Sequence, residues 1–169
     1  MKIRFILLLT LFFGSIVTCY SQTRKDRKKA DKNTINWQYE IRCDKKGRQG
    51  TSLVLVTSYV RKIELAIEQS KKNAVHGVIF TGLSTGDCNE NPLIKDPEVY
   101  EKEKSFFNDF FSEYGEYSKY CTATTGLIED FIKINRKEFS TEMKISVNKD
   151  LLRKDFEKLG LIKSLTSGF

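Results

Sequence analysis

Residues 51–82, TSLVLVTSYVRKIELAIEQSKKNAVHGVIFTG, decide the fold of this chain. The stretch begins with the continuous apolar run 53–56, which predicts a central strand because both of its faces are apolar. From Ser58, a residue type that favours a helix N-terminus, small and apolar residues recur at helical spacing. Gly77 ends this helix, and the apolar run 78–80 predicts a second short strand. We therefore expect a strand-helix-strand unit on which the other elements pack.

Alternating apolar and polar residues predict further strands on both sides of this unit. The first covers residues 35–43, with Ile35, Trp37, Tyr39 and Ile41 on one face, and the glycine-containing loop 44–50 joins it to the run 53–56 as a hairpin. A short strand is expected near residues 117–122. Two longer strands are expected over residues 127–134 and 139–147, and the loop 135–138 joins them.

Two more helices are expected, one in the middle of the chain and one near its end. The first covers residues 97–114, where Asp96 is the N-cap and proline occupies the first helical position. The second covers residues 149–159, with Asn148 as its N-cap, and its inward side chains are Leu151, Leu152, Phe156 and Leu159. Together these elements predict an α+β fold: a mainly antiparallel sheet of five or six strands, with about three helices packed on one face.

The N-terminal residues have the pattern of an export signal. Basic residues precede an apolar run at positions 5–17, and small residues at Cys19 and Ser21 indicate cleavage before Gln22. We therefore expect a signal peptide over residues 1–21, a basic linker over 22–34 and a single domain over 35–169. A retained membrane anchor and lipidation of Cys19 are the alternatives, although Thr18 fits a lipidation motif poorly.

The positive charge of the chain belongs to its N-terminal part. The net charge is +7, and removing the +2 of residues 1–21 and the +4 of residues 23–34 leaves +1 for the domain. A nucleic-acid-binding domain would carry basic residues on its own surface, so nucleic acid is not an expected partner. The basic segment 24–32 is either a solvated spacer or a peripheral contact with anionic lipid, glycan or an acidic partner.

Three cysteines remain after the predicted cleavage: Cys43, Cys88 and Cys121. An exported protein meets oxidising conditions, so one disulfide among these three and one remaining thiol are expected, with the pairing left open. Their spacings match no zinc motif, and we expect neither a metal site nor a cofactor.

The candidate site residues lie in the loop 82–95 and on the helix 97–114. Asp87, Glu90 and Asn91 could bind a ligand from the loop, and Asp87, Glu90 and Asp96 are the carboxylates available to a hydrolase. Four phenylalanines within residues 106–111 indicate core packing, or alternatively an aromatic surface for a partner, for which Phe107 and Phe111 are the candidates.

The chain has few residues for histidine-based catalysis. His76 is the single histidine, it lies at the predicted end of a helix, and we expect it to cap or pack there. The glycine-rich and histidine-containing motifs of nucleotide-binding proteins, hydrolases and zinc proteases are absent from the sequence. Thiol redox chemistry at Cys88 is a further possibility, which would need an exposed thiol of low pKa.

Several phrases resemble proteins of known type. The signal ending CYSQ, the basic spacer, and the phrases NAVHGVIFTG, VNKDLLRKDFEKLGLI and SGF resemble uncharacterised exported proteins of Bacteroides-type bacteria. The layout is similar to small α+β modules of outer-membrane lipoproteins in flagellar and curli-type secretion assembly, but the helix rich in phenylalanine departs from it. The resemblance implies export to the periplasm or outer membrane and carries no functional residue over.

From these features we expect a non-catalytic interaction or assembly protein of the cell envelope, with an envelope protein or a glycan as its partner. The alternative is an envelope hydrolase that acts on glycan or cell wall through the loop carboxylates.

Overall fold

The computed structural model describes residues 37–47, 50–84, 88–113, 115–124, 128 and 130–164. The predicted signal peptide, the basic segment 24–32, Cys19 and the last five residues lie outside these ranges. The described strands are β1 (Tyr39–Lys46), β2 (Thr51–Val60), β3 (Cys121–Ala123), β4 (Asp130–Asn135) and β5 (Glu138–Asn148). The described helices are α3 (Ala66–His76), α4 (Pro97–Lys102), α5 (Lys104–Phe110) and α6 (Lys149–Lys158), with shorter turns η2 (Ile63–Leu65), η3 (Gly77–Thr81) and η4 (Glu116–Tyr120).

The strands form one antiparallel five-stranded sheet, so the predicted α+β class is confirmed. Its order is β1-β2-β5-β3, and β4 pairs with β5 beyond the end of β3. The predicted hairpins 35–56 and 127–147 correspond to the pairs β1–β2 and β4–β5. β2 is the central strand expected from its apolar run, because β1 and β5 pair with it on either side.

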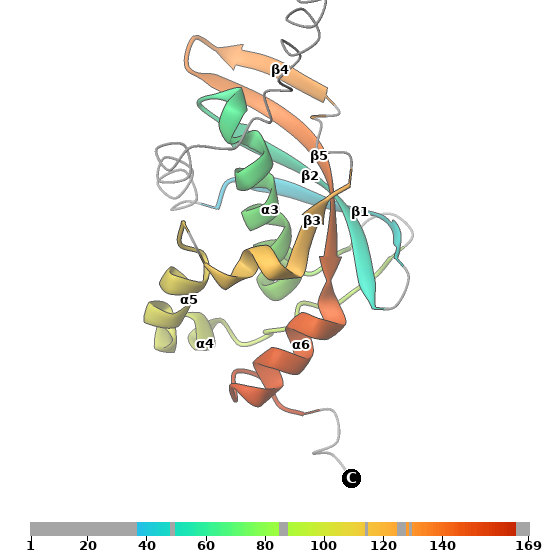
Figure 1. Ribbon diagram of the computed structural model, residues 1–169, viewed down its shortest axis with the longest axis vertical. Coiled ribbons are helices and arrows are strands. Elements are labelled where there is room, and N and C mark those ends of the chain that lie inside the picture. The colour runs from blue at the N-terminus through green and yellow to red at the C-terminus, as the bar shows by residue number, and fades with distance from the viewer. Residues whose placement is uncertain are drawn as a thin grey trace, which may run out of the picture.

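Helix α3 covers one face of the sheet, and the other face is open to solvent. Helix α3 lies across the covered face and contacts four strands, while α6 lies beyond the end of the sheet with α4 and α5 (Figure 1). In β5, alternate side chains point to the covered face as the sequence pattern predicts, and Met143, Ile145 and Val147 are fully buried. On the opposite face Arg42 and Glu142 form an exposed ion pair of 2.7 Å that spans β2.

The predicted start of the first helix is wrong, because β2 continues to Val60. Ser58 is not an N-cap. Its side chain is buried on the covered face. There its Oγ lies 2.9 Å from Oγ of Ser70 and accepts a 2.9 Å hydrogen bond from the side-chain Nδ2 of Asn73. A hydroxyl with these partners can occupy an inward strand position, since its desolvation is offset by hydrogen bonds.

The predicted strand over residues 78–80 is also wrong, so the chain contains no strand-helix-strand unit there. These residues continue the helix as the π-helical turn η3, and Val78 and Ile79 are buried. Their carbonyl oxygens accept hydrogen bonds from the amides of Leu93 and Ile94 at 3.2 and 2.9 Å. The loop therefore satisfies the carbonyls that a helix end leaves open.

Gly77 serves packing rather than termination. Its φ of −60° is helical, and a Cβ atom there would lie 2.6 Å from Cδ1 of Ile41. The missing side chain lets the end of α3 approach β1 closely. The left-handed glycine that closes the segment is Gly82, with φ of +75°.

The remaining helices follow their predicted caps but not all of their predicted faces. Asp96 accepts a hydrogen bond from the amide of Glu98, and Asn148 accepts one from Leu151. The predicted helix 97–114 is divided at Glu103, whose φ and ψ of −104° and 27° interrupt it into α4 and α5. On α6, Leu152 and Phe156 are buried as expected, whereas Leu151 and Leu159 are exposed.

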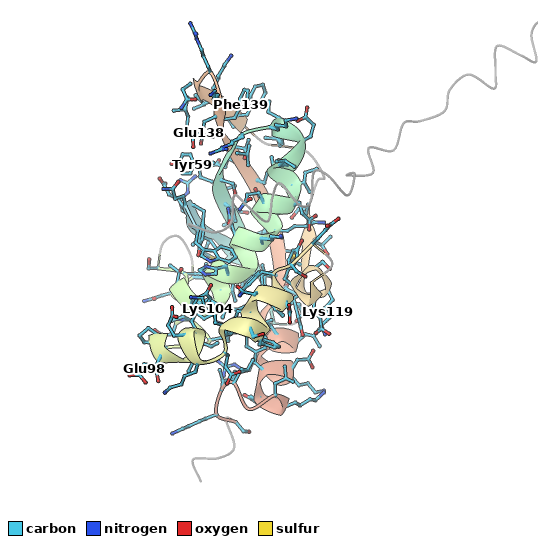
Figure 2. The ribbon with its side chains drawn as sticks, turned by 90° about the vertical axis from the view of Figure 1, so that its left-hand side faces the viewer. Tyr59, Glu98, Lys104, Lys119, Glu138 and Phe139 are labelled. Carbon is cyan, nitrogen blue, oxygen red and sulfur yellow. A yellow bond between two sulfur atoms is a disulfide. The ribbon has the colours of Figure 1, made fainter. Side chains whose placement is uncertain are left out.

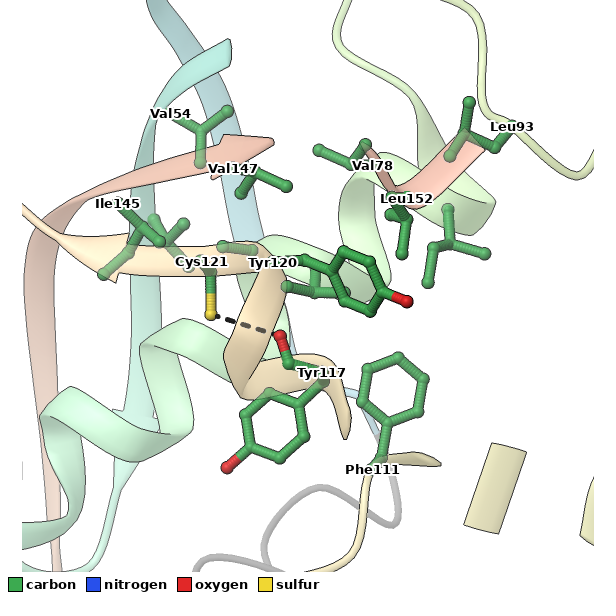
Figure 3. Packing of buried hydrophobic residues seen from close by; sticks show 14 of the residues in the cluster. Val54, Val78, Leu93, Phe111, Tyr117, Tyr120, Cys121, Ile145, Val147 and Leu152 are labelled. Carbon is green, nitrogen blue, oxygen red and sulfur yellow. Dashed lines mark hydrogen bonds between the residues drawn. The ribbon is translucent and has the colours of Figure 1, made fainter. Parts of the chain in front are cut away.

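The core continues from the sheet into the aromatic helices. Figure 3 shows Ile145 and Val147 of β5 on one side of this packing, with Tyr120 and Phe111 on the other. The ring centroid of Phe110 lies 5.8 Å from that of Tyr120 and 5.6 Å from that of Phe156. Therefore α5, η4 and α6 share one aromatic cluster.

Candidate binding groove

A stack of rings lies where the chain enters β1 and α3 ends. The rings of Trp37 and His76 are stacked with centroids 3.7 Å apart and an angle of 17° between their planes. Tyr39 meets the same histidine edge-on, and its hydroxyl lies 2.8 Å from Nδ1 of His76. The hydroxyl of Thr81 lies 3.0 Å from that of Tyr39. Three elements therefore hold His76 in one orientation.

The backbone of Trp37 has an unusual conformation. Its φ is +44°, and it is the only non-glycine residue with positive φ among the described residues. A bulky side chain costs free energy in this region, on the order of 1–3 kcal/mol. The ring contacts that Trp37 makes with His76 and Phe111, at 3.7 and 4.9 Å, hold it there. The predicted strand start is wrong at Trp37, which precedes β1, but its side chain packs against the core.

The stack forms one wall of an open groove of about 390 Å³. The other wall comes from η3, the loop that follows it and the start of α4. The lining residues are Trp37, His76, Phe80, Ile94, Lys95, Pro97, Tyr100 and Glu101. Because four of these eight side chains are aromatic rings, the groove offers flat apolar surfaces on both walls.

Buried phenylalanines support the groove from below. Phe80 meets Phe107 at 5.0 Å and Tyr100 at 5.2 Å, both edge-on, and Tyr100 stacks on Phe107 at 5.5 Å. Phe111 contacts the rings of Trp37 and His76. The groove walls are therefore anchored in the core, and little ordering of side chains is required when a ligand enters.

Burial keeps the ring stack uncharged. It lowers the pKa of His76 to about 3 and raises the pKa of Tyr39 to about 12. The imidazole and the phenol are both neutral at pH 7. The charged groups of the groove are Lys95 and Glu101, which are exposed at its rim.

The predicted loop residues are placed differently from one another. Asp87 lies outside the described residues. Glu90 is mostly buried, with its carboxylate 2.7 Å from Nζ of Lys149 and accepting hydrogen bonds from Oγ of Ser52 at 3.1 and 3.2 Å. The carbonyl of Asn91 accepts a 3.5 Å contact from the same lysine. Glu90 and Asn91 thus fasten the loop to β2 and α6.

The two predicted aromatic site residues lie in the core. Phe107 is 1% exposed and Phe111 is 6% exposed. Neither presents a free surface, but each contacts rings that line the groove. Their burial fits the core-packing alternative, and their part in binding a partner stays a prediction.

The three cysteines within the described residues are one disulfide pair and one free thiol. Cys43 of β1 and Cys88 of the loop form a disulfide, and both are buried. Cys121 is a buried free thiol whose Sγ lies 3.6 Å from the carbonyl oxygen of Tyr117 (Figure 3). Burial raises the pKa of Cys121 to about 12. A thiol in this state is a poor nucleophile.

The described part of the chain offers no grouping of three or more histidine, cysteine and acidic side chains that could hold a metal ion. Within the same residues, no helix has the length and apolar character needed to cross a membrane.

Comparison of the chain with protein-family models, with curated proteins and with solved structures gives no match. The groove is therefore interpreted from its own chemistry.

The sequence signal for this groove was present but scattered. The rings of the groove come from distant segments of the chain. The close approach of α3 to β1 brings His76 to Trp37 and Tyr39, and ring contacts with Phe80 and Phe107 hold Tyr100 beside them. The positive φ of Trp37 has no sequence marker, since glycine and asparagine are the residues that usually indicate it.

Proposed function

We propose that this protein is an exported, non-catalytic binding protein of the cell envelope, and that the groove beside Trp37 and His76 holds an apolar, extended peptide segment of a protein partner. The observation that carries the proposal is the lining itself: four aromatic rings, Ile94 and Pro97 around about 390 Å³, with charges only at the rim. Grooves lined by aromatic rings suit apolar peptides, and proline-containing ones in particular, because their preformed polyproline II conformation loses little entropy on binding.

A peptide fits this groove better than a glycan does. Sugars need several side-chain hydrogen bonds in addition to a ring for stacking. The main polar lining groups here are His76, Lys95, Glu101 and the hydroxyl of Tyr100, and the two charged ones lie at the rim. One nitrogen of His76 already lies 2.8 Å from the hydroxyl of Tyr39. The opposite charges of Lys95 and Glu101 can orient a peptide backbone or a charged flanking residue.

The disulfide supports export as part of the proposal. Disulfides persist in secreted and periplasmic proteins and are rare in reducing compartments. The signal-like N-terminus and the resemblance to exported proteins agree with this location. The basic segment 24–32 gives the domain a tether that can contact anionic membrane surface or partner.

The carboxylate-based alternative gains no support from the described contacts. Glu90 is engaged by Lys149 and Ser52, and Asp96 caps α4. A carboxylate already held in an ion pair is poorly suited to exchange protons with a substrate.

Site-specific photo-crosslinking in the producing cell tests the proposal. A photoreactive phenylalanine replaces Lys95 at the groove rim, and a matched control replaces Lys154, which is exposed on α6. We expect position 95 to give a defined adduct whose cross-linked mass is a peptide, and expect Tyr100→Ala to abolish it. Equal adducts at both positions, or a carbohydrate adduct at position 95, would contradict the proposal.

The partner peptide identified in this way can then be titrated in vitro. Trp37 is the only tryptophan of the chain, so its fluorescence reports on the groove directly. Binding should change this emission in the wild type and require at least tenfold more peptide in Tyr100→Ala. A peptide that binds both proteins equally without changing Trp37 emission would place the site elsewhere.

A further inference from the structure

The second ring nitrogen of His76 is left unused by the fold. Trp37 stacks on one face of the imidazole at 3.7 Å, and the hydroxyl of Tyr39 lies 2.8 Å from Nδ1. The tip of the ring carries Nε2, which forms no hydrogen bond within the described residues and is not a fully buried atom. Because His76 lines the groove, this tip is the part of the ring that a ligand can reach.

The other nitrogen of the imidazole is joined to a short chain of hydroxyl groups. The hydroxyl of Tyr39 lies 2.8 Å from Nδ1 of His76 and 3.0 Å from Oγ1 of Thr81. A phenol has one proton to donate, and a ring nitrogen accepts it more strongly than an aliphatic hydroxyl does, because the nitrogen is the stronger base. Tyr39 therefore donates to Nδ1, and Thr81 donates to Tyr39.

This chain decides which nitrogen of His76 carries the proton. A neutral imidazole has one N–H, and the nitrogen that accepts a hydrogen bond is the unprotonated one. The imidazole is neutral because burial lowers the pKa of His76 to about 3, and the phenol keeps its proton because burial raises the pKa of Tyr39 to about 12. Nε2 is therefore an N–H donor at the tip of the ring.

The carboxylates of α4, the helix beside the groove, are engaged elsewhere. Glu101 at the rim lies 3.5 Å from Nζ of Lys104, and Glu98 lies 2.8 Å from Nζ of Lys102. Figure 2 shows Glu98 pointing outward from this helix, away from the rest of the molecule. The acceptor for Nε2 of His76 must therefore come from the ligand, because a ligand without one would bury the donor unsatisfied.

The groove is suited to a peptide that offers a carbonyl oxygen but few N–H groups. An ordinary peptide carries one N–H for each carbonyl, and an N–H that is buried against aromatic rings loses its hydrogen bond to water. The one charged acceptor of the lining, Glu101, lies at the rim. Proline has a carbonyl but no N–H, and proline-rich segments dock into grooves lined by aromatic rings.

Within the proposed peptide groove, on which this step rests, we propose that His76 is the specificity-determining residue: Nε2–H donates a hydrogen bond to a main-chain carbonyl of a proline-containing segment. Tyr39 and Thr81 are positioning residues, because they act through His76 and hold its proton on Nε2. The aromatic walls of the groove contact the pyrrolidine rings of the same segment.

Nuclear magnetic resonance of protein made with isotope-labelled histidine tests the proton position without any ligand. His76 is the only histidine, so the spectrum holds one imidazole if the protein is purified without a histidine tag. Long-range proton–nitrogen correlations should show a protonated Nε2 and an unprotonated Nδ1 at neutral pH. Tyr39→Phe removes the donor to Nδ1 and should raise the population protonated on Nδ1. A wild-type ring protonated on Nδ1, or equal populations in the two proteins, overturns the proposal.

Calorimetric titration with a blocked oligoproline peptide tests the donor itself. We expect saturable binding to the wild type and about tenfold weaker binding to His76→Phe, which keeps a flat ring but has no N–H. His76→Gln, whose side-chain amide supplies an N–H, should recover part of this loss. A blocked oligoalanine peptide of the same length should bind the wild type more weakly than oligoproline. Thermal unfolding checks that each variant is folded.

A wild type that does not bind oligoproline, or that binds it no more tightly than His76→Phe does, overturns this inference. The groove itself is judged separately, by the adduct at position 95. A captured peptide that lacks proline and binds the wild type and His76→Phe equally would keep the groove and reject the role of His76. If position 95 captures no peptide, the proposed function fails and this inference fails with it.

Discussion

Trp37 stacks on His76 at 3.7 Å, so the one tryptophan and the one histidine of the chain are a single structural unit. The tryptophan precedes the first strand and the histidine ends α3, and neither ring would have this environment without the other. The hydroxyl of Tyr39 and the ring of Phe111 also contact the imidazole, which is buried except where it lines the groove. This burial favours the neutral form of His76, which has consequences for pH.

The enclosed histidine should make folding dependent on pH. The pKa of His76 is about 3 in the folded protein and about 6.5 when unfolded, so the unfolded chain binds more protons between these values. The contribution of His76 to the free energy of unfolding is therefore complete above pH 6.5 and declines as the pH falls toward 3. In His76→Phe this decline disappears. We expect the free energy of unfolding of the wild type, relative to that of His76→Phe, to fall by about 1–2 kcal/mol between pH 7.5 and 5.

Urea unfolding at pH 7.5, 6 and 5 measures this difference directly. Trp37 fluorescence provides a second readout, because an imidazolium in contact with indole would quench its emission. The folded wild type should show no fluorescence transition near pH 6.5. Parallel pH profiles for the two proteins would mean that the histidine is solvated rather than enclosed.

Polar residues at inward positions of β2 are the reason why the sequence pattern placed the end of this strand too early. In β2 the inward positions are Ser52, Val54, Val56, Ser58 and Val60. The strand was expected to end before Ser58, because serine is a common helix cap and a poor core residue. Only the partners from α3, Ser70 and Asn73, make the serine hydroxyl acceptable in the core. Ser70 and Asn73 lie 12 and 15 residues further along the chain, so a local sequence pattern does not include them.

The run Val78-Ile79-Phe80 was predicted as a strand but forms a π-helical turn. β-Branched and aromatic residues favour strands locally, but here burial against the loop decides the structure. Hydrogen bonds from Leu93 and Ile94 stabilise the carbonyls of the π-helical turn, and no local rule predicts them. Of the helix ends predicted from one residue type at one position, the caps Asp96 and Asn148 are confirmed, whereas those at Ser58 and Gly77 are wrong. The groove could not be predicted, since its walls come from segments that meet only in the folded chain.

A buried lysine next to the aromatic core should lower stability. Lys72 of α3 is fully buried, with its ammonium group 5.4 Å from the centroid of the Tyr117 ring. Burial lowers the pKa of Lys72 to about 8, although the charge of Glu113 acts in the opposite direction. We expect Lys72→Met to raise the free energy of unfolding by about 1–3 kcal/mol at pH 7, because the charge no longer has to be desolvated.

The gain from Lys72→Met should depend on pH in a defined direction. The folded protein releases the proton of Lys72 near pH 8 and the unfolded chain near pH 10.5, so wild-type stability rises between these values. The advantage of the variant should therefore shrink as the pH rises from 8 to 10.5. Lys71→Met is the control on the same helix, at a partly exposed position. A Lys72→Met protein less stable than the wild type at pH 7 would assign the lysine a structural contact worth more than its desolvation.

The disulfide should be the strongest single support of the long loop. It joins Cys43 of the edge strand β1 to Cys88 and closes a segment with a sequence separation of 45 residues. The entropy of a closed loop of this length corresponds to about 4 kcal/mol at 25 °C. Native disulfides often contribute less than this entropy alone, so we expect the double variant Cys43→Ser/Cys88→Ser to lose roughly 2–5 kcal/mol in urea unfolding.

Cys121→Ala is the matched control for this loss, because it also removes a buried sulfur but no cross-link. It should cost less than the double variant. Alkylation counts the thiols independently in the protein that begins at residue 22 and so lacks Cys19: it should show none reactive at pH 8 when native, and one when unfolded and unreduced. Because the pKa of Cys121 is about 12 in the folded state, its thiolate is scarce at pH 8 even where the reagent reaches it. Two or three reactive thiols in the unfolded, unreduced protein would show that Cys43 and Cys88 are not paired.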